Sequence, residues 1–183
     1  MAEVHYQLGA AIPLNQMIPE VDGEAEVPQE IPNAPGLYLI LNQANLAVRN
    51  RYMGISSHLR DRFRQRQAAC FELGFARNIL DPVAAYVGQV RYRSHGVAGW
   101  SDAAGYREGE LSIDLDGYSY DFEHLFIKSA QSIFGGTITN TKKVRDLTNN
   151  HPQHAIDISI TWLEGQATLV RTLSLGPGQT LPE

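Results

Sequence analysis

Short runs of alternating and continuous hydrophobic residues occupy the middle of the chain. GLYLILN (36–42) and RNRYMGI (49–55) are rich in aromatic and aliphatic residues, and the polar segment NQANLA lies between them. Two such runs around a turn-like segment predict a β-hairpin. The run VAAYVGQVRYR (83–93) has β-branched and aromatic residues at the density of a strand. It predicts a third strand of the same sheet.

Two other segments have the spacing of amphipathic helices. SHLRDRFRQRQAACFEL (57–73) follows the predicted hairpin, with Ser56 or Ser57 available as its N-cap. At about 100° per residue, Leu59 and Phe63 fall on one apolar stripe of this helix. A second helix is predicted over 118–134. It is expected to end there because a Gly-Gly pair, typical of a helix C-terminus, follows.

The two ends of the chain have a different pattern. Residues 13–35 contain five prolines among scattered acidic residues, so we expect residues 1–33 to form an extended, acidic arm rather than a helix. The runs DISITWL and ATLVRTLSL flank Glu164 and Gly165, which predicts a closing β-hairpin within residues 141–183. The segment 94–118 is rich in Gly, Ser and Asp and is expected to be a long loop.

These elements predict an α+β fold. Its core, residues 34–140, would be a small antiparallel sheet of about three central strands flanked by helices. The N-terminal arm and the C-terminal hairpin would extend this core, with the hairpin packed on it, in a single globular domain. A length of 183 residues with 43% hydrophobic content suits one sizeable core.

Composition restricts the compartment and the chemistry. The single cysteine, Cys70, excludes an internal disulfide and a multi-cysteine zinc site. No apolar run approaches the roughly 20 residues that span a bilayer, and MAEVHYQLG lacks the pattern of a secretion signal. We therefore expect no membrane partner and a protein that is cytoplasmic where it is synthesised, leaving secretion by a signal-independent route open.

Basic charge is concentrated in one block. The net charge is −5, but residues 49–93 hold nine arginines and three acidic residues, a balance of 9 − 3 = +6. The remainder therefore carries −5 − 6 = −11. Such asymmetry favours an anion-binding face on an otherwise acidic protein, and an arginine-rich solvated helix is the alternative.

Within the first helix, Arg62 and Arg66 lie together at one edge of the apolar stripe, whereas Arg60 and Arg64 lie beyond the other edge. An arginine at such an edge can bury its stem and present a planar charged fork to phosphate oxygens. The alternative for each one is an ordinary surface arginine.

In the second helix, Glu123 falls inside the wide apolar sector, whereas His124 and Lys128 fall on the polar side. A carboxylate there costs several kcal/mol unless a cation or strong donors compensate it. Glu123 is therefore a candidate site residue, with a structural salt bridge, for instance to Arg62, as the alternative.

Four features in order resemble the GIY-YIG nuclease superfamily. They are Gly36-Leu37-Tyr38, Tyr52-Met53-Gly54, Arg62 ten residues after Tyr52, and Glu123 in FEHLFI. The resemblance covers about residues 34–140. It implies two tyrosines on adjacent antiparallel strands, an arginine on the first helix and a metal-binding glutamate on a later helix.

The resemblance also implies a reaction. Phosphodiester hydrolysis needs an activated water and neutralisation of the charge that builds on phosphate oxygens. Glu123 would bind Mg²⁺ or Mn²⁺, Arg62 would bind the scissile phosphate, and Tyr38 and Tyr52 would position or activate the water. Gly36 and Gly54 would leave room for a nucleic-acid backbone.

Other positions are expected to have supporting roles. Some members have a histidine near the arginine, which His58 matches in part, and many have an asparagine after the glutamate, for which Asn140 is the candidate. Arg66 would assist Arg62. His151 and His154, in HPQH, are expected to be loop residues without a metal, because Pro152 opposes a helical pair.

Two classes of function follow. The first is a metal-dependent endonuclease that hydrolyses DNA, with RNA not excluded, in a restriction-type role, in a mobile element, or as an antibacterial toxin with a cognate inhibitor or immunity protein. The second is a catalytically inactive nucleic-acid- or protein-binding module on the same fold. Retention of both tyrosines, Arg62 and Glu123 favours the enzyme.

Overall fold

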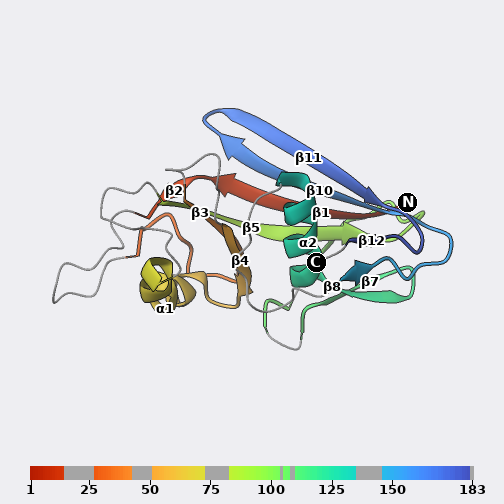
Figure 1. Ribbon diagram of the computed structural model, residues 1–183, viewed down its shortest axis with the longest axis horizontal. Coiled ribbons are helices and arrows are strands. Elements are labelled where there is room, and N and C mark those ends of the chain that lie inside the picture. Colours follow the sequence, from red (N-terminus) through yellow and green to blue (C-terminus); the bar gives the residue numbers. More distant parts are fainter. Residues whose placement is uncertain are drawn as a thin grey trace.

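A mixed sheet with two helices forms the α+β fold of this chain (Figure 1). The computed structural model describes residues 1–14, 27–42, 51–72, 83–103, 105–107, 110–134 and 146–181. Among these residues, the large sheet has eight strands, and the order of its main path is β11-β10-β1-β5-β3-β4. The short strands β2 (Ile12–Pro13) and β6 (Ser101–Asp102) pair with β5 beside this path.

The predicted hairpin and third strand are confirmed. β3 (Gly36–Asn42) pairs with β4 (Arg51–Ser56), and its other edge pairs with β5 (Val83–Arg93), both in the antiparallel sense. The helix α1 (Leu59–Glu72) connects the β4 side to β5, as the sequence pattern predicted. This unit contains three of the four features that resemble GIY-YIG nucleases.

The prediction of an extended N-terminal arm is wrong for residues 2–10, which form a strand of the large sheet. β1 (Ala2–Ala10) is a central strand, antiparallel to β5 and parallel to β10 (Ile156–Glu164). Val4, Tyr6 and Leu8 alternate with more exposed neighbours and are buried at 5% exposure or less, which is the period of a half-buried strand. Because its partners lie far along the chain, the local pattern did not identify it. Residues 15–26 of the expected arm lie outside the described residues.

The prediction of a small antiparallel sheet with about three central strands underestimates its size. The sheet continues from β5 through β1 into the C-terminal strands β10 and β11. The predicted C-terminal hairpin is confirmed as β10 and β11 (Ala167–Leu175), with Gly165 in the left-handed conformation (φ 63°) at the turn. The hairpin is part of the main sheet rather than a separate layer on a core, since β10 pairs with β1.

Two small sheets complete the strand content. β7 (Ser112–Leu115) pairs with β8 (Tyr118–Asp121), and β9 (Leu147–Thr148) pairs with β12 (Thr180–Leu181). The segment expected to be a long loop therefore contains β6 and β7. β8 also occupies the residues expected to open the second helix, so that α2 spans Phe122–Phe134.

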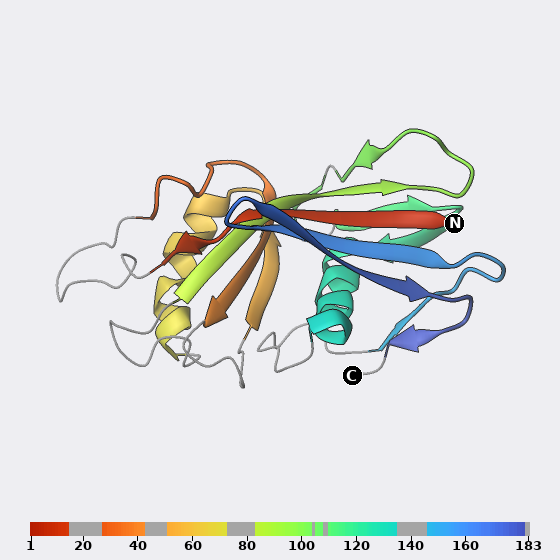
Figure 2. The ribbon, with the colours of Figure 1, turned by 90° about the horizontal axis from the view of Figure 1, so that it is seen from above.

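The two helices cover opposite faces of β3 and β4. Leu59 and Phe63 of α1 share a core with Tyr38 and Ile40, whereas α2 packs with residues of the other alternation, such as Leu39. Alternate residues of a strand point to opposite faces, so the two clusters lie on either side of the sheet. Figures 1 and 2 agree, because β3 and β4 lie between α1 and α2 in both views.

α2 is buried more completely than its sequence predicted. His124 is 4% exposed and Lys128 is 2% exposed, although both were expected on a polar side. The reason is that α2 contacts β4 and β11 of the large sheet and also β8, β9 and β12. Structure on both sides of the helix leaves it little solvent face.

None of the helices in the described segments is long and apolar enough to cross a membrane.

Candidate functional site

The structure brings Tyr38 and Tyr52 together on one face of the sheet. Tyr38 pairs with Gly54, and Tyr52 pairs with Ile40, so the two tyrosines are diagonal neighbours across β3 and β4. Their ring centroids lie 6.0 Å apart. Tyr38 also packs edge-on against Phe63 of α1 at 5.4 Å. Tyr38 is only 2% exposed, whereas Tyr52 is half-buried, so Tyr52 is the more accessible phenol.

The space beside the two motif glycines is occupied by the protein itself. A Cβ at Gly54 would lie 2.7 Å from the Tyr38 hydroxyl oxygen. A Cβ at Gly36 would lie 2.8 Å from the Gly88 carbonyl oxygen and 2.9 Å from Leu59 Cδ1. The expectation that these glycines leave room for a nucleic-acid backbone is therefore wrong. They allow close internal contacts of the Tyr38 ring, β5 and α1.

Local hydrogen bonds fix the start of α1. The Ser56 hydroxyl accepts a hydrogen bond from the His58 amide at 3.0 Å and donates one to the His58 carbonyl at 2.8 Å. The Leu59 amide donates to the Ala34 carbonyl at 3.1 Å. Ser56 therefore provides the capping hydroxyl, and the helix start is held against the segment that leads into β3.

The arginines of α1 differ in what they contact. Arg60 donates to the carbonyls of Val27, Pro28 and Ile31 at 3.1–3.4 Å, and Arg64 forms an exposed ion pair with Asp61 at 3.3 Å. Arg62 is half-buried, and no hydrogen bond or ion pair joins its guanidinium to another residue in the described part of the chain. The side chain of Arg66 lies outside the described residues.

A cavity of about 260 Å³ opens at the corner where β4 passes into α1. Its lining is mainly polar and comes from three separate parts of the chain: Asn33, Pro35, Ser57, His58, Tyr106, Arg107 and Glu110. The Arg62 amide donates to the His58 carbonyl at 3.1 Å, so Arg62 lies one helical turn beyond this cavity. We refer to it as the corner pocket.

Tyr106, in the lining of the corner pocket, connects the pocket to the first turn of α2. The Phe122 amide donates to the Leu111 carbonyl at 2.9 Å, and the Phe122 ring meets Tyr106 at 5.4 Å. The pocket is therefore bordered by elements from both faces of the sheet: α1 on one side and the segment bound to the start of α2 on the other.

Glu123 follows Phe122 in that first turn and is half-buried. It does not share a face with Tyr38 and Tyr52, because α2 covers the opposite side of β3 and β4. Among the described residues, no group of three metal-binding side chains includes Glu123. The structure thus brings together Tyr38, Tyr52 and α1, and it places Glu123 on the other side. Asn140 lies outside the described residues.

Sequence reasoning missed a cluster elsewhere. Asp116, His151 and His154 each offer one ligand atom, and these atoms lie within 4.8 Å of one another. The two histidines lie in a loop, as expected, but their rings stack at 4.5 Å without any helix. Helical spacing was the wrong criterion for judging whether the two histidines could share a metal. The third member of the cluster, Asp116, comes from a turn 35 residues before His151 in the chain.

The chain matches no family model, no curated protein and no solved structure.

Proposed function

We propose that this chain is a metal-dependent endonuclease of the GIY-YIG type that hydrolyses phosphodiester bonds in DNA. The observation that carries the proposal is the β4-β3-β5 unit. Its register sets Tyr38 and Tyr52 side by side, and the chain then enters a helix that bears Arg62. The order of these elements, as well as the residues, is what the resemblance implies.

In this proposal, Arg62 binds the scissile phosphate. Its guanidinium can form paired hydrogen bonds with phosphate oxygens and neutralise the charge that grows on them. Tyr52, as the accessible phenol, orients the attacking water. Tyr38 is enclosed by Tyr52, Phe63 and Gly54, so we assign it the role of holding the Tyr52 ring in place.

The corner pocket is the proposed entry for the nucleic-acid backbone. It lies at the N-terminal end of a 14-residue helix, where backbone amides and the helix dipole favour an anion. Arg107 and His58 line it, and Arg62 follows one turn later. Tyr106 of its lining packs against Phe122 in the first turn of α2, so the pocket lies between α1 and a segment that contacts α2.

Glu123 is the proposed ligand of Mg²⁺ or Mn²⁺. One or two carboxylates together with substrate phosphates commonly hold Mg²⁺, so a half-buried glutamate that belongs to no three-residue cluster in the described part of the chain fits this ion. When bound, the ion would supply positive charge at the phosphate. This assignment requires the first turn of α2 to reach the phosphate at the corner pocket, since the body of the helix covers the other face of the sheet.

The second candidate is a nucleic-acid-binding module without catalysis. The burial of Tyr38 and the separation of α2 from the tyrosine face favour it. Among enzymatic roles, a restriction-type nuclease and an antibacterial toxin with an immunity protein both fit a compact nuclease unit.

The test is incubation of the purified protein with plasmid DNA and structured RNA in Mg²⁺, Mn²⁺ or EDTA. Wild-type protein should cleave only with metal. Arg62→Ala and Glu123→Gln should lose most of that activity while keeping wild-type circular dichroism. Cleavage in EDTA, or full activity of both variants, would contradict the mechanism. Salt-dependent binding of either nucleic acid without cleavage in any metal would instead establish the second candidate.

A further inference from the structure

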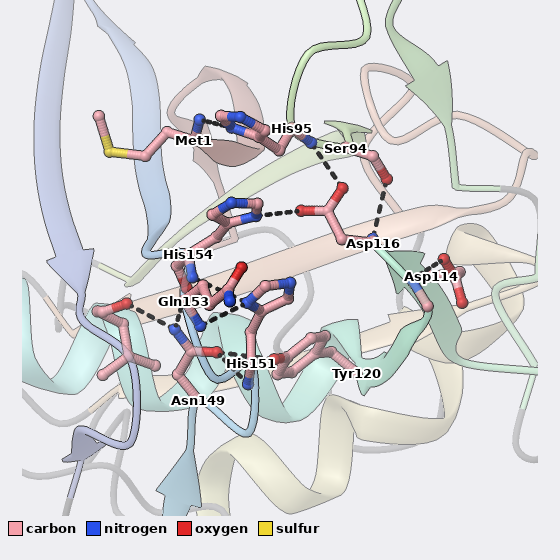
Figure 3. Close-up of polar contacts among 12 residues, drawn as sticks. Met1, Ser94, His95, Asp114, Asp116, Tyr120, Asn149, His151, Gln153 and His154 are labelled. Carbon is pink, nitrogen blue, oxygen red and sulfur yellow. Dashed lines mark hydrogen bonds and ion pairs between the residues drawn. The ribbon is translucent and has the colours of Figure 1, made fainter.

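Three loops meet at the end of the sheet that carries the β7–β8 turn. Figure 3 shows Asp116 from that turn facing His154, with His151 beside it from the loop after β9. The residues after β5 close the third side, because the His95 ring lies 4.1 Å from the His154 ring. Asp116 adopts the left-handed conformation (φ 58°), which turns its carboxylate toward these rings.

Two ligand atoms in this cluster are buried without a hydrogen-bond partner among the described residues. They are Oδ2 of Asp116 and Nδ1 of His154, and they lie 3.6 Å apart. That separation is too long for a good hydrogen bond. Two ligands that each lie about 2.0–2.2 Å from one tetrahedral ion are about 3.4 Å apart. The spacing therefore fits two ligands of a single ion.

Hydrogen bonds hold both groups in this orientation. The other carboxylate oxygen of Asp116 accepts a hydrogen bond from the His95 amide at 2.8 Å, and the Asp116 amide donates to the Ser94 hydroxyl at 3.1 Å. Oδ1 of Asp116 is thus used by the His95 amide, and Oδ2 is left to bind an ion. A carboxylate with one oxygen fixed in this way is a preorganised ligand, because outer hydrogen bonds orient metal-binding groups.

The loop of His154 is fixed by His151 and Asn149. Nδ1 of His151 accepts hydrogen bonds from the amides of Gln153 and His154 at 3.1 and 2.8 Å. The Asn149 side-chain amide donates to the carbonyls of His154 and Leu175 at 3.0 and 2.9 Å. His151 therefore acts chiefly as a positioning residue, because its Nδ1 lone pair is already used.

We infer that Asp116 and His154 bind a divalent transition-metal ion of the Zn²⁺ class, with His151 positioning the loop and water completing the shell. Mixed nitrogen and oxygen donors suit Zn²⁺ and its neighbours, whereas Mg²⁺ and Ca²⁺ prefer oxygen alone. The ion would join the β7–β8 turn to the loop before β10. This site is separate from the Mg²⁺ proposed at Glu123 and does not depend on the nuclease proposal.

The test is binding of Zn²⁺ to EDTA-stripped, full-length protein, measured by calorimetry. One ion per chain is expected, and a 100-fold excess of Mg²⁺ should not displace it. Zinc at about 100 times its Kd should raise the thermal midpoint by about 5–11 °C. In the ¹⁵N spectrum of the histidine rings, zinc should shift the Nδ1 signal of His154.

Two variants and one control assign the ligands. Asp116→Asn keeps an acceptor for the His95 amide and tolerates the left-handed conformation, and His154→Ala removes the ring. Each should weaken zinc binding about tenfold or more. Asp114→Asn is the matched control, because Asp114 lies in β7 two residues before Asp116 and its carboxylate accepts a hydrogen bond from the Gly117 amide at 2.9 Å instead. It should bind zinc as the wild type does. No zinc binding by the wild type, an unshifted His154 Nδ1 signal, displacement by Mg²⁺, or wild-type affinity in both variants would overturn the inference.

Discussion

At the scale of single residues, Gly54 and Tyr38 explain why a glycine closes the second motif. The Tyr38 ring, held by Phe63 and Tyr52, occupies the position where a side chain at 54 would stand. The glycine of the Tyr-Met-Gly triplet is therefore required for internal packing of the tyrosine pair.

Gly54→Ala should consequently destabilise the protein. The added methyl group would meet the Tyr38 hydroxyl at 2.7 Å, and overpacking of this kind costs about 1–3 kcal/mol. Urea unfolding measures the change. Gly99→Ala is the control, since a Cβ there meets nothing within 4 Å and should leave the free energy of unfolding nearly unchanged. Equal stability of the two variants would contradict the proposed contact.

Tyr6 links stability to alkaline pH. Burial raises the pKa of this phenol well above its usual value, and the charges of Asp121 and Tyr106 act in the same direction. An acid whose pKa is higher in the folded state stabilises the fold below its unfolded pKa of about 10, and that stabilisation is lost as the pH rises above it. The free energy of unfolding should therefore fall above about pH 10.

Tyr6→Phe should reduce that alkaline loss without abolishing it, because burial also raises the pKa of Tyr106 and Tyr120. At neutral pH the variant should lose about 1–3 kcal/mol, since the buried Phe122 carbonyl loses the hydroxyl that donates to it at 2.9 Å. Urea unfolding at several pH values tests both effects. An unchanged pH dependence would show that Tyr6 is not the titrating group.

At the scale of elements, Arg60 joins α1 to the segment 27–31. Its guanidinium donates to the backbone carbonyls of Val27, Pro28 and Ile31 there. Arg60 lies beyond the edge of the apolar stripe opposite to the one that carries Arg62, so neighbouring arginines of one helix have different roles. A count of basic residues along the sequence does not distinguish them.

Arg60→Ala should release this segment. We expect faster amide hydrogen exchange over residues 27–36 and a loss of about 1–3 kcal/mol, because buried acceptors lose a charged donor. Arg64→Ala is matched in type and helix, but its exposed ion pair with Asp61 should contribute about 0–1 kcal/mol. Similar amide exchange rates over residues 27–36 in both variants would contradict the stabilising role of the hydrogen bonds from Arg60.

Local patterns predicted the elements that are stabilised locally. The hairpin of β3 and β4 and the C-terminal hairpin pair strands that are neighbours in sequence, and α1 follows β4 directly. β5 pairs with β3 about 40 to 50 positions earlier, and it was predicted because its own run of β-branched and aromatic residues is typical of a strand. β1 was missed because its pairing with β10 joins residues about 150 positions apart, and the proline-rich stretch after it dominated the interpretation. The burial of Lys128 was missed because no pattern within α2 reports the strands that cover its second side.

The residues of the candidate site also differ in whether local sequence could predict their positions. Sequence placed Tyr38, Tyr52 and Arg62 on adjacent elements, and the structure puts the two tyrosines against the helix that carries the arginine. Which face α2 covers depends on the whole sheet, so the position of Glu123 could not be read from helical spacing. The metal cluster of Asp116 and His154 needs three loops and has no local signal.

At the scale of the whole molecule, two helices lie on opposite sides of one hairpin. The corner pocket is connected to both, since α1 begins at it and the segment that supplies Tyr106 and Glu110 to its lining contacts the first turn of α2. Within the arginine-rich block, Arg60, Arg62 and Arg64 place positive charge on α1 in an otherwise acidic chain. Arg91 and Arg93, at the end of β5, instead form ion pairs with Asp102 and Glu3. We therefore expect nucleic acid to bind on the α1 side.

The most direct measurement compares Mg²⁺-dependent plasmid nicking by Arg62→Ala and Arg64→Ala at one salt concentration. Loss of a charge-stabilising donor at the reacting phosphate typically lowers the rate about 10²–10³-fold, so Arg62→Ala should be nearly inactive, while Arg64→Ala should nick at the wild-type rate. Equal activity of the two folded variants would contradict a phosphate-binding role for Arg62 and the nuclease site built around it.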